Sequence, residues 1–203
     1  MKTLCIATRN AHKVQELAPV LAPFWTVKCT VDYPEMTDTE IEESGDTFLA
    51  NATLKAVQTS QTVPDYVLAD DSGLECDALD GAPGVFSARY GGIPSSAERN
   101  NAKLLQELER AGATTPQQRA ARFRCVLVLA HEGAVVASFD GTCEGMIGLK
   151  PMGTHGFGYD PLFIPQGYAR TFGQLSEKTK MGLSHRGLAL KRFLEWCKAN
   201  PVE

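Results

Sequence analysis

Several features are scarce in this sequence of 203 residues, and each scarcity argues against a class of protein. No apolar run reaches membrane-spanning length, and the first residues are too short a run for the core of a secretion signal. Acidic residues outnumber Lys and Arg by 24 to 20, so the net charge of −4 argues against a broad nucleic-acid-binding face. The six cysteines form no Cys-x-x-Cys pair, which predicts reduced, mostly buried thiols. We expect a cytoplasmic protein that binds neither nucleic acid nor membrane.

Common catalytic motifs are also absent. Ser72 does not lie in a Gly-x-Ser-x-Gly elbow, which argues against a serine hydrolase. The glycines of segment 153–161 have neither the spacing of a Walker loop nor that of a dinucleotide-binding fingerprint. Any bound phosphate must therefore be held in another way.

The composition is that of an ordinary globular protein, with 43% hydrophobic and 22% charged residues. The length fits one large domain or a single two-lobed domain over residues 1–203. Short apolar runs alternate with helix-like periodicity, and runs 123–130 and 135–139 predict an antiparallel pair, so we expect an α/β protein with a mixed sheet. The other expected strands are 4–7, 26–30, 66–69, 145–149 and 162–164. The expected helices follow Asn10, run from Thr47 to about Thr59, follow Ser95 or Ser96, and run from Ser184 to about Ala199.

Two adjacent carboxylates, Asp70 and Asp71, directly follow the predicted buried strand 66–69. Ligands of open α/β sheets bind outside the carboxyl ends of strands, so these carboxylates are expected at the mouth of a crevice. Carboxylate oxygens suit Mg²⁺, and either Glu42 or Glu43 is a candidate second ligand beside Asp71. An Asp-Asp-Ser-Gly turn after an ordinary strand is the alternative, and it is the commoner explanation of this stretch taken alone.

Cations stand where two predicted helices begin. Lys13 lies in the first turn of the helix after Asn10, and His185 and Arg186 directly follow Ser184. The helix dipole disfavours a cation there, whereas free backbone amides and a cation together bind a phosphate or carboxylate. The pattern therefore favours two anion sites, and the alternative is a pair of solvated helix starts.

A third helix adds a polar face, because Asn51 and Lys55 lie four residues apart and project from one side. Both are candidates to reach one ligand, although a solvated amphipathic face is the commoner case. The glycine-rich segment 153–161 permits close backbone approach around the rings of Phe157 and Tyr159, which suits stacking on a planar base.

Several stretches occur together in order along the chain: Thr8-Arg9-Asn10-Ala11-His12-Lys13, Glu43-Ser44-Gly45-Asp46-Thr47-Phe48, Asp70-Asp71-Ser72-Gly73-Leu74, Gly81 to Tyr90, Gly156-Phe157-Gly158-Tyr159-Asp160-Pro161 and Ser184-His185-Arg186-Gly187. With these motifs the chain resembles the Ham1/RdgB family of non-canonical purine nucleoside triphosphate pyrophosphatases over essentially its whole length. The resemblance implies a homodimeric α/β protein whose mixed sheet and flanking helices form two lobes around a central cleft, the ITPase-like fold. It also implies magnesium-dependent hydrolysis of ITP, dITP and XTP to the monophosphate and pyrophosphate.

The resemblance also implies roles for individual residues. Asp71 is the general base and a metal ligand, with Glu42 or Glu43 as the second carboxylate, and Ser72 touches the substrate. The phosphate-binding residues are Thr8, Arg9, Asn10, Ala11, His12 and Lys13. The residues expected to contact base and phosphates are Phe157, Gly158, Tyr159, Asp160, Lys180, His185 and Arg186. Arg9 and His155 depart from the family pattern, which usually has glycine or serine at the first position and often glycine at the second.

Two other functions remain open at this stage. A non-catalytic nucleotide sensor on the same fold needs the anion sites and the aromatic loop but no general base, and the Asp70-Asp71 pair favours an enzyme. A phosphatase that releases orthophosphate shares the metal and the cations, and product analysis separates it from a pyrophosphatase.

Overall fold

The computed structural model describes residues 2–36, 39 and 41–201, and it contains a mixed sheet with the strand order β2-β1-β3-β4-β5-β6. The chain divides into two compact units, which are described separately: unit 1 holds residues 1–71, 126–140 and 189–203, and unit 2 holds residues 72–125 and 141–188. The strands are β1 (Thr3–Ala7), β2 (Thr26–Cys29), β3 (Tyr66–Cys76), β4 (Ala120–His131), β5 (Ala134–Ile147) and β6 (Phe163–Pro165). The α-helices are α1 (Ala11–Leu21), α2 (Phe48–Thr62), α3 (Ala97–Arg110), α4 (Glu177–Leu183) and α5 (His185–Ala199).

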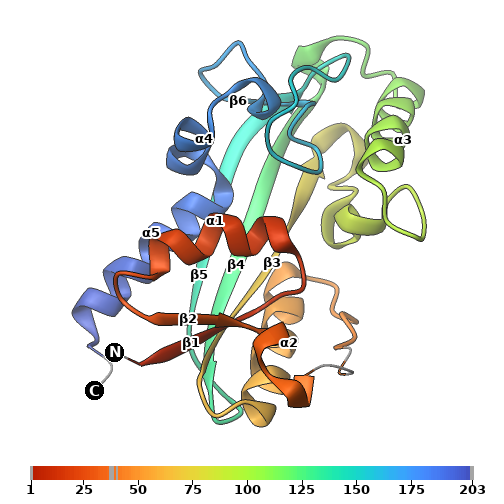
Figure 1. The fold of residues 1–203 in the computed structure, drawn as a ribbon. Coiled ribbons are helices and arrows are strands. Elements are labelled where there is room, and N and C mark those ends of the chain that lie inside the picture. The colour runs from red at the N-terminus through yellow and green to blue at the C-terminus, as the bar shows by residue number, and fades with distance from the viewer. Residues whose placement is uncertain (1, 37–38, 40, 202–203) are drawn as a thin grey trace. The chain divides into compact units, whose positions relative to one another are not determined.

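In unit 1, β1 pairs in parallel with β2 on one side and with β3 on the other. A strand in that position is covered on both faces, which is why Leu4–Ala7 is an unbroken buried run. Helix α1 connects β1 to β2 (Figure 1), and its buried residues Leu17 and Leu21 explain the helical periodicity of the sequence. The predicted N-cap is confirmed, because the side chain of Asn10 accepts a hydrogen bond from the amide of His12 at 3.0 Å.

Strand β3 is longer than the sequence predicted. We expected the strand to end at Ala69, but it continues through both aspartates to Cys76. The alternating burial of Leu74 and Cys76 keeps the chain extended, so the expectation that the aspartates form a turn or follow the strand was wrong. The last register of β1 pairs Ala7 with Ala69, so the two carboxylates lie on β3 just beyond the end of β1.

The predicted antiparallel pair is the hairpin formed by β4 and β5, which are neighbours in the sheet. Two residues connect them, Glu132 with φ +51° and Gly133 with φ +76°. Positive φ at both positions is the geometry of a tight hairpin turn. The separate strand expected at 145–149 was wrong in its limits, because β5 continues through it to Ile147.

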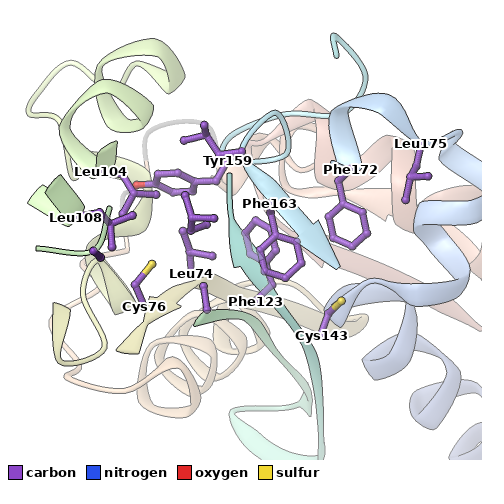
Figure 2. Packing of buried hydrophobic residues seen from close by; sticks show 14 residues of the cluster. Leu74, Cys76, Leu104, Leu108, Phe123, Cys143, Tyr159, Phe163, Phe172 and Leu175 are labelled. Atoms are coloured by element: carbon purple, nitrogen blue, oxygen red, sulfur yellow. The ribbon is translucent and has the colours of Figure 1, made fainter. Parts of the chain in front are cut away.

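Unit 2 has its own apolar core, which Figure 2 shows. Leu104 and Leu108 of α3 belong to it, and aromatic rings fill much of the rest. The ring centroids of Phe123 and Phe163 are 4.6 Å apart, and those of Phe163 and Phe172 are 5.2 Å apart. Tilted ring pairs at such distances stabilise a core beyond the area that they bury.

The C-terminal region contains one helix more than the sequence predicted. Helix α4 precedes Ser184, and α5 then begins at His185 as expected. Ser184 ends α4 in an extended conformation, and its hydroxyl accepts a hydrogen bond from the amide of Gly187 at 3.1 Å. Residues 37, 38 and 40, which lie between β2 and α2 in the sequence, are outside the described residues. Within the described part of the chain, no helix combines the length and apolarity that crossing a membrane requires.

Candidate active site

Lys13 of α1 and Asp70 of β3 form an ion pair in unit 1. Asp70 is 1% exposed, and its backbone carbonyl also accepts a hydrogen bond from the Lys13 ammonium at 3.4 Å. A cation in the first turn of a helix is therefore compensated by a buried carboxylate. The sequence identified both residues but not their pairing.

Lys55 of α2 lies between two further carboxylates. Its ammonium group is 3.0 Å from Oε1 of Glu43 and 3.4 Å from Oδ1 of Asp71, and it donates to the backbone carbonyl of Asp70 at 2.7 Å. We call Glu43, Lys55 and Asp71 the carboxylate cluster. The sequence predicted that Asn51 and Lys55 project from one side of α2 and can reach one ligand. In the structure, the ammonium group of Lys55 holds two carboxylates that come from different segments.

The environment shifts the pKa values in this cluster. Burial raises the pKa of the Asp71 carboxyl above its usual range, the positive charge of Lys55 opposes the rise, and the negative charge of Glu43 adds to it. Burial lowers the pKa of Lys55, but the negative charges of Asp71, Glu43 and Asp70 together outweigh it, so the net shift is upward. Lys55 therefore stays charged, and Asp71 is a stronger base than an ordinary aspartate.

The carboxylate cluster has the donor atoms that magnesium prefers. Oδ2 of Asp71 is buried, and no hydrogen-bond partner for it exists among the described residues. A buried oxygen without a hydrogen-bond partner destabilises the fold unless a ligand binds to it. No group of three or more His, Cys, Asp and Glu in the described ranges is arranged to hold a metal, yet Mg²⁺ commonly binds one or two carboxylates and takes its other ligands from water and phosphate. The residues present therefore fit a magnesium ion.

The structure separates the two candidate glutamates. Glu43 is half-buried and contacts Lys55, whereas Glu42 is exposed. Asn51, the other predicted residue of α2, is buried, and its Oδ1 accepts a hydrogen bond from the amide of Gly45 at 2.8 Å. Its side chain thus holds the segment that leads from Glu43 into α2.

Arg9 occupies the position where the sequence departs from the family pattern. Its guanidinium group donates hydrogen bonds to the backbone carbonyls of Met36 at 3.3 Å and Thr39 at 2.8 Å. Asn10 caps α1, and its own amide is bonded to the hydroxyl of Thr8 at 3.1 Å. The segment from Thr8 to Lys13 is thus tied locally, with Ala11 and His12 exposed at the start of α1.

The remaining predicted residues belong to unit 2. Arg186 of α5 is 1% exposed, and its guanidinium group donates to the hydroxyl of Ser72 at 2.9 Å. His185 is also buried, and its ring stacks on Phe123 with centroids 4.6 Å apart. A buried arginine aimed at a hydroxyl supplies hydrogen-bond donors for an oxygen-rich ligand.

The glycine loop, Gly156–Asp160, presents an aromatic ring to two cations. The Lys180 ammonium lies 4.7 Å from the ring centroid of Phe157, and the Arg186 guanidinium lies 5.6 Å from it. Asp160 is buried, and its Oδ2 accepts hydrogen bonds from the Phe157 amide at 2.7 Å and from Lys180 at 2.8 Å. The structure thus brings Phe157, Lys180 and Arg186 together, and Asp160 shapes the loop from within.

Sequence reasoning missed one polar residue of this region. Asn101 of α3 donates a hydrogen bond from Nδ2 to the carbonyl of Gly158 at 3.0 Å. Its signal in the sequence is an asparagine three residues before Leu104, on the face of α3 that packs inward.

These features define an α/β protein in which carboxylates and lysines gather beyond the end of a parallel strand. In unit 2, buried cations face an aromatic glycine loop. The chain belongs to the Ham1 family, whose sequence model matches residues 4–196.

Relatives with curated names are similar over nearly their whole length. A protein of Desulforamulus reducens named dITP/XTP pyrophosphatase is 46% identical over 193 residues, which is 95% of this chain and 94% of the relative. One of the same name from an Exiguobacterium species is 48% identical over 191 residues, 94% of each chain. Among solved structures, the Ham1 protein of Staphylococcus aureus gives a TM-score of 0.86 at 37% identity, with 98% of this chain and 99% of that one covered. The expected family and the α/β fold with a mixed sheet are therefore confirmed.

Proposed function

We propose that this chain hydrolyses ITP, dITP and XTP to the nucleoside monophosphate and pyrophosphate, with magnesium as the metal. The carboxylate cluster carries the proposal, because it combines a buried Asp71 oxygen, which no described residue pairs, with an ammonium group shared by Glu43. Membership of the Ham1 family and the names of the relatives support the substrate class.

Asp71 acts as the general base in this proposal. Water attacks the α-phosphorus, its proton passes to the Asp71 carboxylate, and the bond between the α-phosphorus and the bridging oxygen breaks to release pyrophosphate. The raised pKa of Asp71 favours this proton transfer, because a carboxylate with a higher pKa holds the proton more strongly. Asp70 is less suited to the role, since it is paired with Lys13.

Asp71 and Glu43 are the proposed holders of the magnesium ion. When bound, the ion neutralises charge on phosphate oxygens. When no magnesium ion is bound, the ammonium group of Lys55 keeps the two carboxylates close, because without a cation they would repel each other. Glu42, which is exposed, is assigned no ligand role.

Each unit, taken by itself, holds cations that suit one part of a nucleoside triphosphate. Lys13 and the start of α1 are proposed to bind the triphosphate, where the ammonium group and the helix dipole favour an anion. Lys180 and Arg186 flank Phe157, whose ring is proposed to stack on the purine.

Base selection follows from donors that are already buried. The guanidinium of Arg186 suits the 6-keto oxygen of hypoxanthine or xanthine, whereas the 6-amino group of adenine leaves a buried donor unpaired. A mismatch of this kind in a site built for hydrogen bonding lowers kcat/KM by up to ~10⁴-fold. We therefore propose selection against ATP.

The proposal also includes a cytoplasmic location, where nucleotide pools are found, and a homodimer. The dimer is tested by the mass of the protein in solution at micromolar concentration, for which a mass near 44 kDa is expected from a 22.0 kDa chain.

Hydrolysis of ITP in ¹⁸O-labelled water tests the reaction itself. Attack at the α-phosphorus places the label in the monophosphate and leaves the pyrophosphate unlabelled. Label in the pyrophosphate would move the attack to the β-phosphorus. Release of orthophosphate as the first product would replace the proposal with a phosphatase.

A further inference from the structure

Asn101 is a buried polar residue on the inward face of α3. It is 8% exposed, and its neighbours one and two turns along the helix are the core residues Leu104 and Leu108. Its Nδ2 donates to the carbonyl of Gly158, which lies 57 residues further along the chain. A carbonyl only accepts, so this contact fixes which end of the amide faces the glycine loop.

The oxygen atom of the same side-chain amide, Oδ1, is buried. Among the residues that the structure describes, no donor reaches the buried Oδ1 of Asn101. A buried acceptor without a donor destabilises a fold, whereas leucine at this position fills a similar volume without that penalty. Stability alone therefore does not account for an asparagine here.

The residue whose carbonyl Asn101 binds, Gly158, is a glycine, so its backbone can adopt dihedral angles that other residues avoid. Gly158 has φ +61°, and a Cβ atom built on it meets none of the described residues within 4 Å. The hydrogen bond from Asn101 is a contact that restrains this peptide. At Gly156, with φ +73°, an added Cβ would instead collide with the Asp160 carboxylate.

Other bonds hold the loop on either side of Gly158. Asp160 accepts from the amide of Phe157, and the hydroxyl of Tyr159 donates to the carbonyl of Ser87 at 2.8 Å. The Asn101 bond anchors the carbonyl between these two points. Phe157, whose ring faces Lys180 and Arg186, precedes the anchored peptide directly.

We infer that Asn101 is a positioning residue for the purine base: by fixing the Gly158 carbonyl, it sets the loop in its base-binding conformation before the nucleotide arrives. This inference rests on the proposed function, because it takes the glycine loop to be the base-binding segment. Preorganisation of this kind lowers the free energy needed to order the loop on binding. It affects substrate binding, whereas the proposed chemistry belongs to Asp71 in the other unit.

Substitution Asn101→Leu tests the inference. It removes the unpaired acceptor and also the donor to the Gly158 carbonyl, and because Gly158 is only half-buried that carbonyl can bond to water instead, so the melting temperature should change little. KM for ITP should increase about fivefold, the effect of one neutral hydrogen bond, while kcat changes less than twofold. Asn101→Asp, which keeps the size and replaces the donor amide with a carboxylate, should raise KM in the same way, and it serves as the test if the leucine variant does not fold.

Leu108→Ala is the matched control, because it lies on the same helix and opens a cavity in the same core. It should lower the melting temperature and leave KM unchanged. An unchanged KM in both Asn101 variants, or a lower melting temperature with normal kinetics, would show a structural role and overturn the inference. Wild-type protein that does not hydrolyse ITP at all would instead overturn the proposed function, so the two failures are distinguishable.

Discussion

The Lys55 ammonium group lies 3.4 Å from Oδ1 of Asp71, and the second carboxylate oxygen of the same aspartate is buried without a partner in the described structure. One oxygen of Asp71 is thus held while the other is available to a ligand. Burial raises the pKa of Asp71 despite the positive charge of Lys55. The folded environment therefore stabilises the charged carboxylate less well than water does. Function and stability are therefore expected to conflict at this residue.

Asp71→Asn should remove that conflict together with the activity. Loss of a general base lowers turnover by about 10²- to 10⁴-fold, and loss of a metal ligand adds to the effect. A carboxyl whose pKa is raised on folding stabilises the fold only in its protonated form, so at pH 7 the asparagine variant should melt at the same temperature or higher. Steady-state kinetics and thermal unfolding measure both effects.

Asp140→Asn is the control for this variant, because Asp140 is exposed and pairs with Arg192. It should change neither quantity measurably. Near-normal turnover of Asp71→Asn with magnesium present would move the general base elsewhere, with Asp70 as the first alternative.

The two neighbouring glutamates should differ in their effect on magnesium. Glu43→Gln removes a carboxylate that shares Lys55 with Asp71, so the magnesium concentration for half-maximal activity should rise roughly 10- to 100-fold. Glu42→Gln is the matched control and should leave it unchanged, since Glu42 is exposed. Magnesium titrations of ITP hydrolysis compare the two, and the reverse order would assign the metal to Glu42.

The Lys13–Asp70 pair should behave as a buried ion pair. Lys13→Met takes the ammonium partner from a carboxylate that is itself buried, which costs about 3 to 5 kcal/mol of unfolding free energy. The double variant Lys13→Met with Asp70→Asn should recover most of that loss, because no uncompensated charge remains. Urea denaturation of the wild type, the two single variants and the double variant gives the four unfolding free energies of a double-mutant cycle. Additive losses of free energy would contradict a direct coupling between Lys13 and Asp70.

Losing Lys13 should also weaken catalysis. A hydrogen bond to a charged group contributes about 1.5 to 3 kcal/mol, so kcat/KM should fall by one to two orders of magnitude in Lys13→Met. The double variant should not recover this activity even where it recovers stability. If the double variant recovered both stability and kcat/KM, Lys13 would contribute to the stability of the fold and not to catalysis.

Alkaline pH should destabilise the protein through its buried thiols. Burial raises the pKa of Cys5 to about 12, that of Cys76 to about 12 and that of Cys143 to about 11, whereas thiols of an unfolded chain ionise near pH 8.5. A group whose pKa is raised on folding stabilises the fold fully below its unfolded pKa and progressively less above it, so stability should decline from about pH 8.5 upward. Urea denaturation under reducing conditions from pH 7 to 10 measures the decline, which should be smaller in Cys5→Ala.

Much of the fold was predictable because local chemistry and tertiary packing agree. Asn10 and Thr47 cap helices as their residue types predict, and both accept hydrogen bonds from the first turn of the helix that follows. Strand β3 was predicted too short because two carboxylates and a glycine are typical of turns. Pairing in the sheet and the burial of Leu74 and Cys76 outweigh that local preference.

The candidate site was predictable as a set of residues but not as a set of pairs. Sequence spacing on α2 indicated that Lys55 projects with Asn51, but it could not show that Lys55 binds Glu43 while Asn51 binds the Gly45 amide. The contact between Asn101 and Gly158 joins segments 57 residues apart, and no local pattern encodes it. The family was identified correctly from the motifs, as the family model confirms, and relatives of this chain carry the name dITP/XTP pyrophosphatase.

The rate of pyrophosphate release from a panel of nucleoside triphosphates tests the central claim most directly. With magnesium present, kcat/KM for ITP, dITP and XTP should exceed that for ATP by at least about a hundredfold, with no orthophosphate formed before pyrophosphate. Equal rates for ATP and ITP, or orthophosphate as the first product, would contradict the assignment of this chain as a pyrophosphatase of non-canonical purine nucleotides.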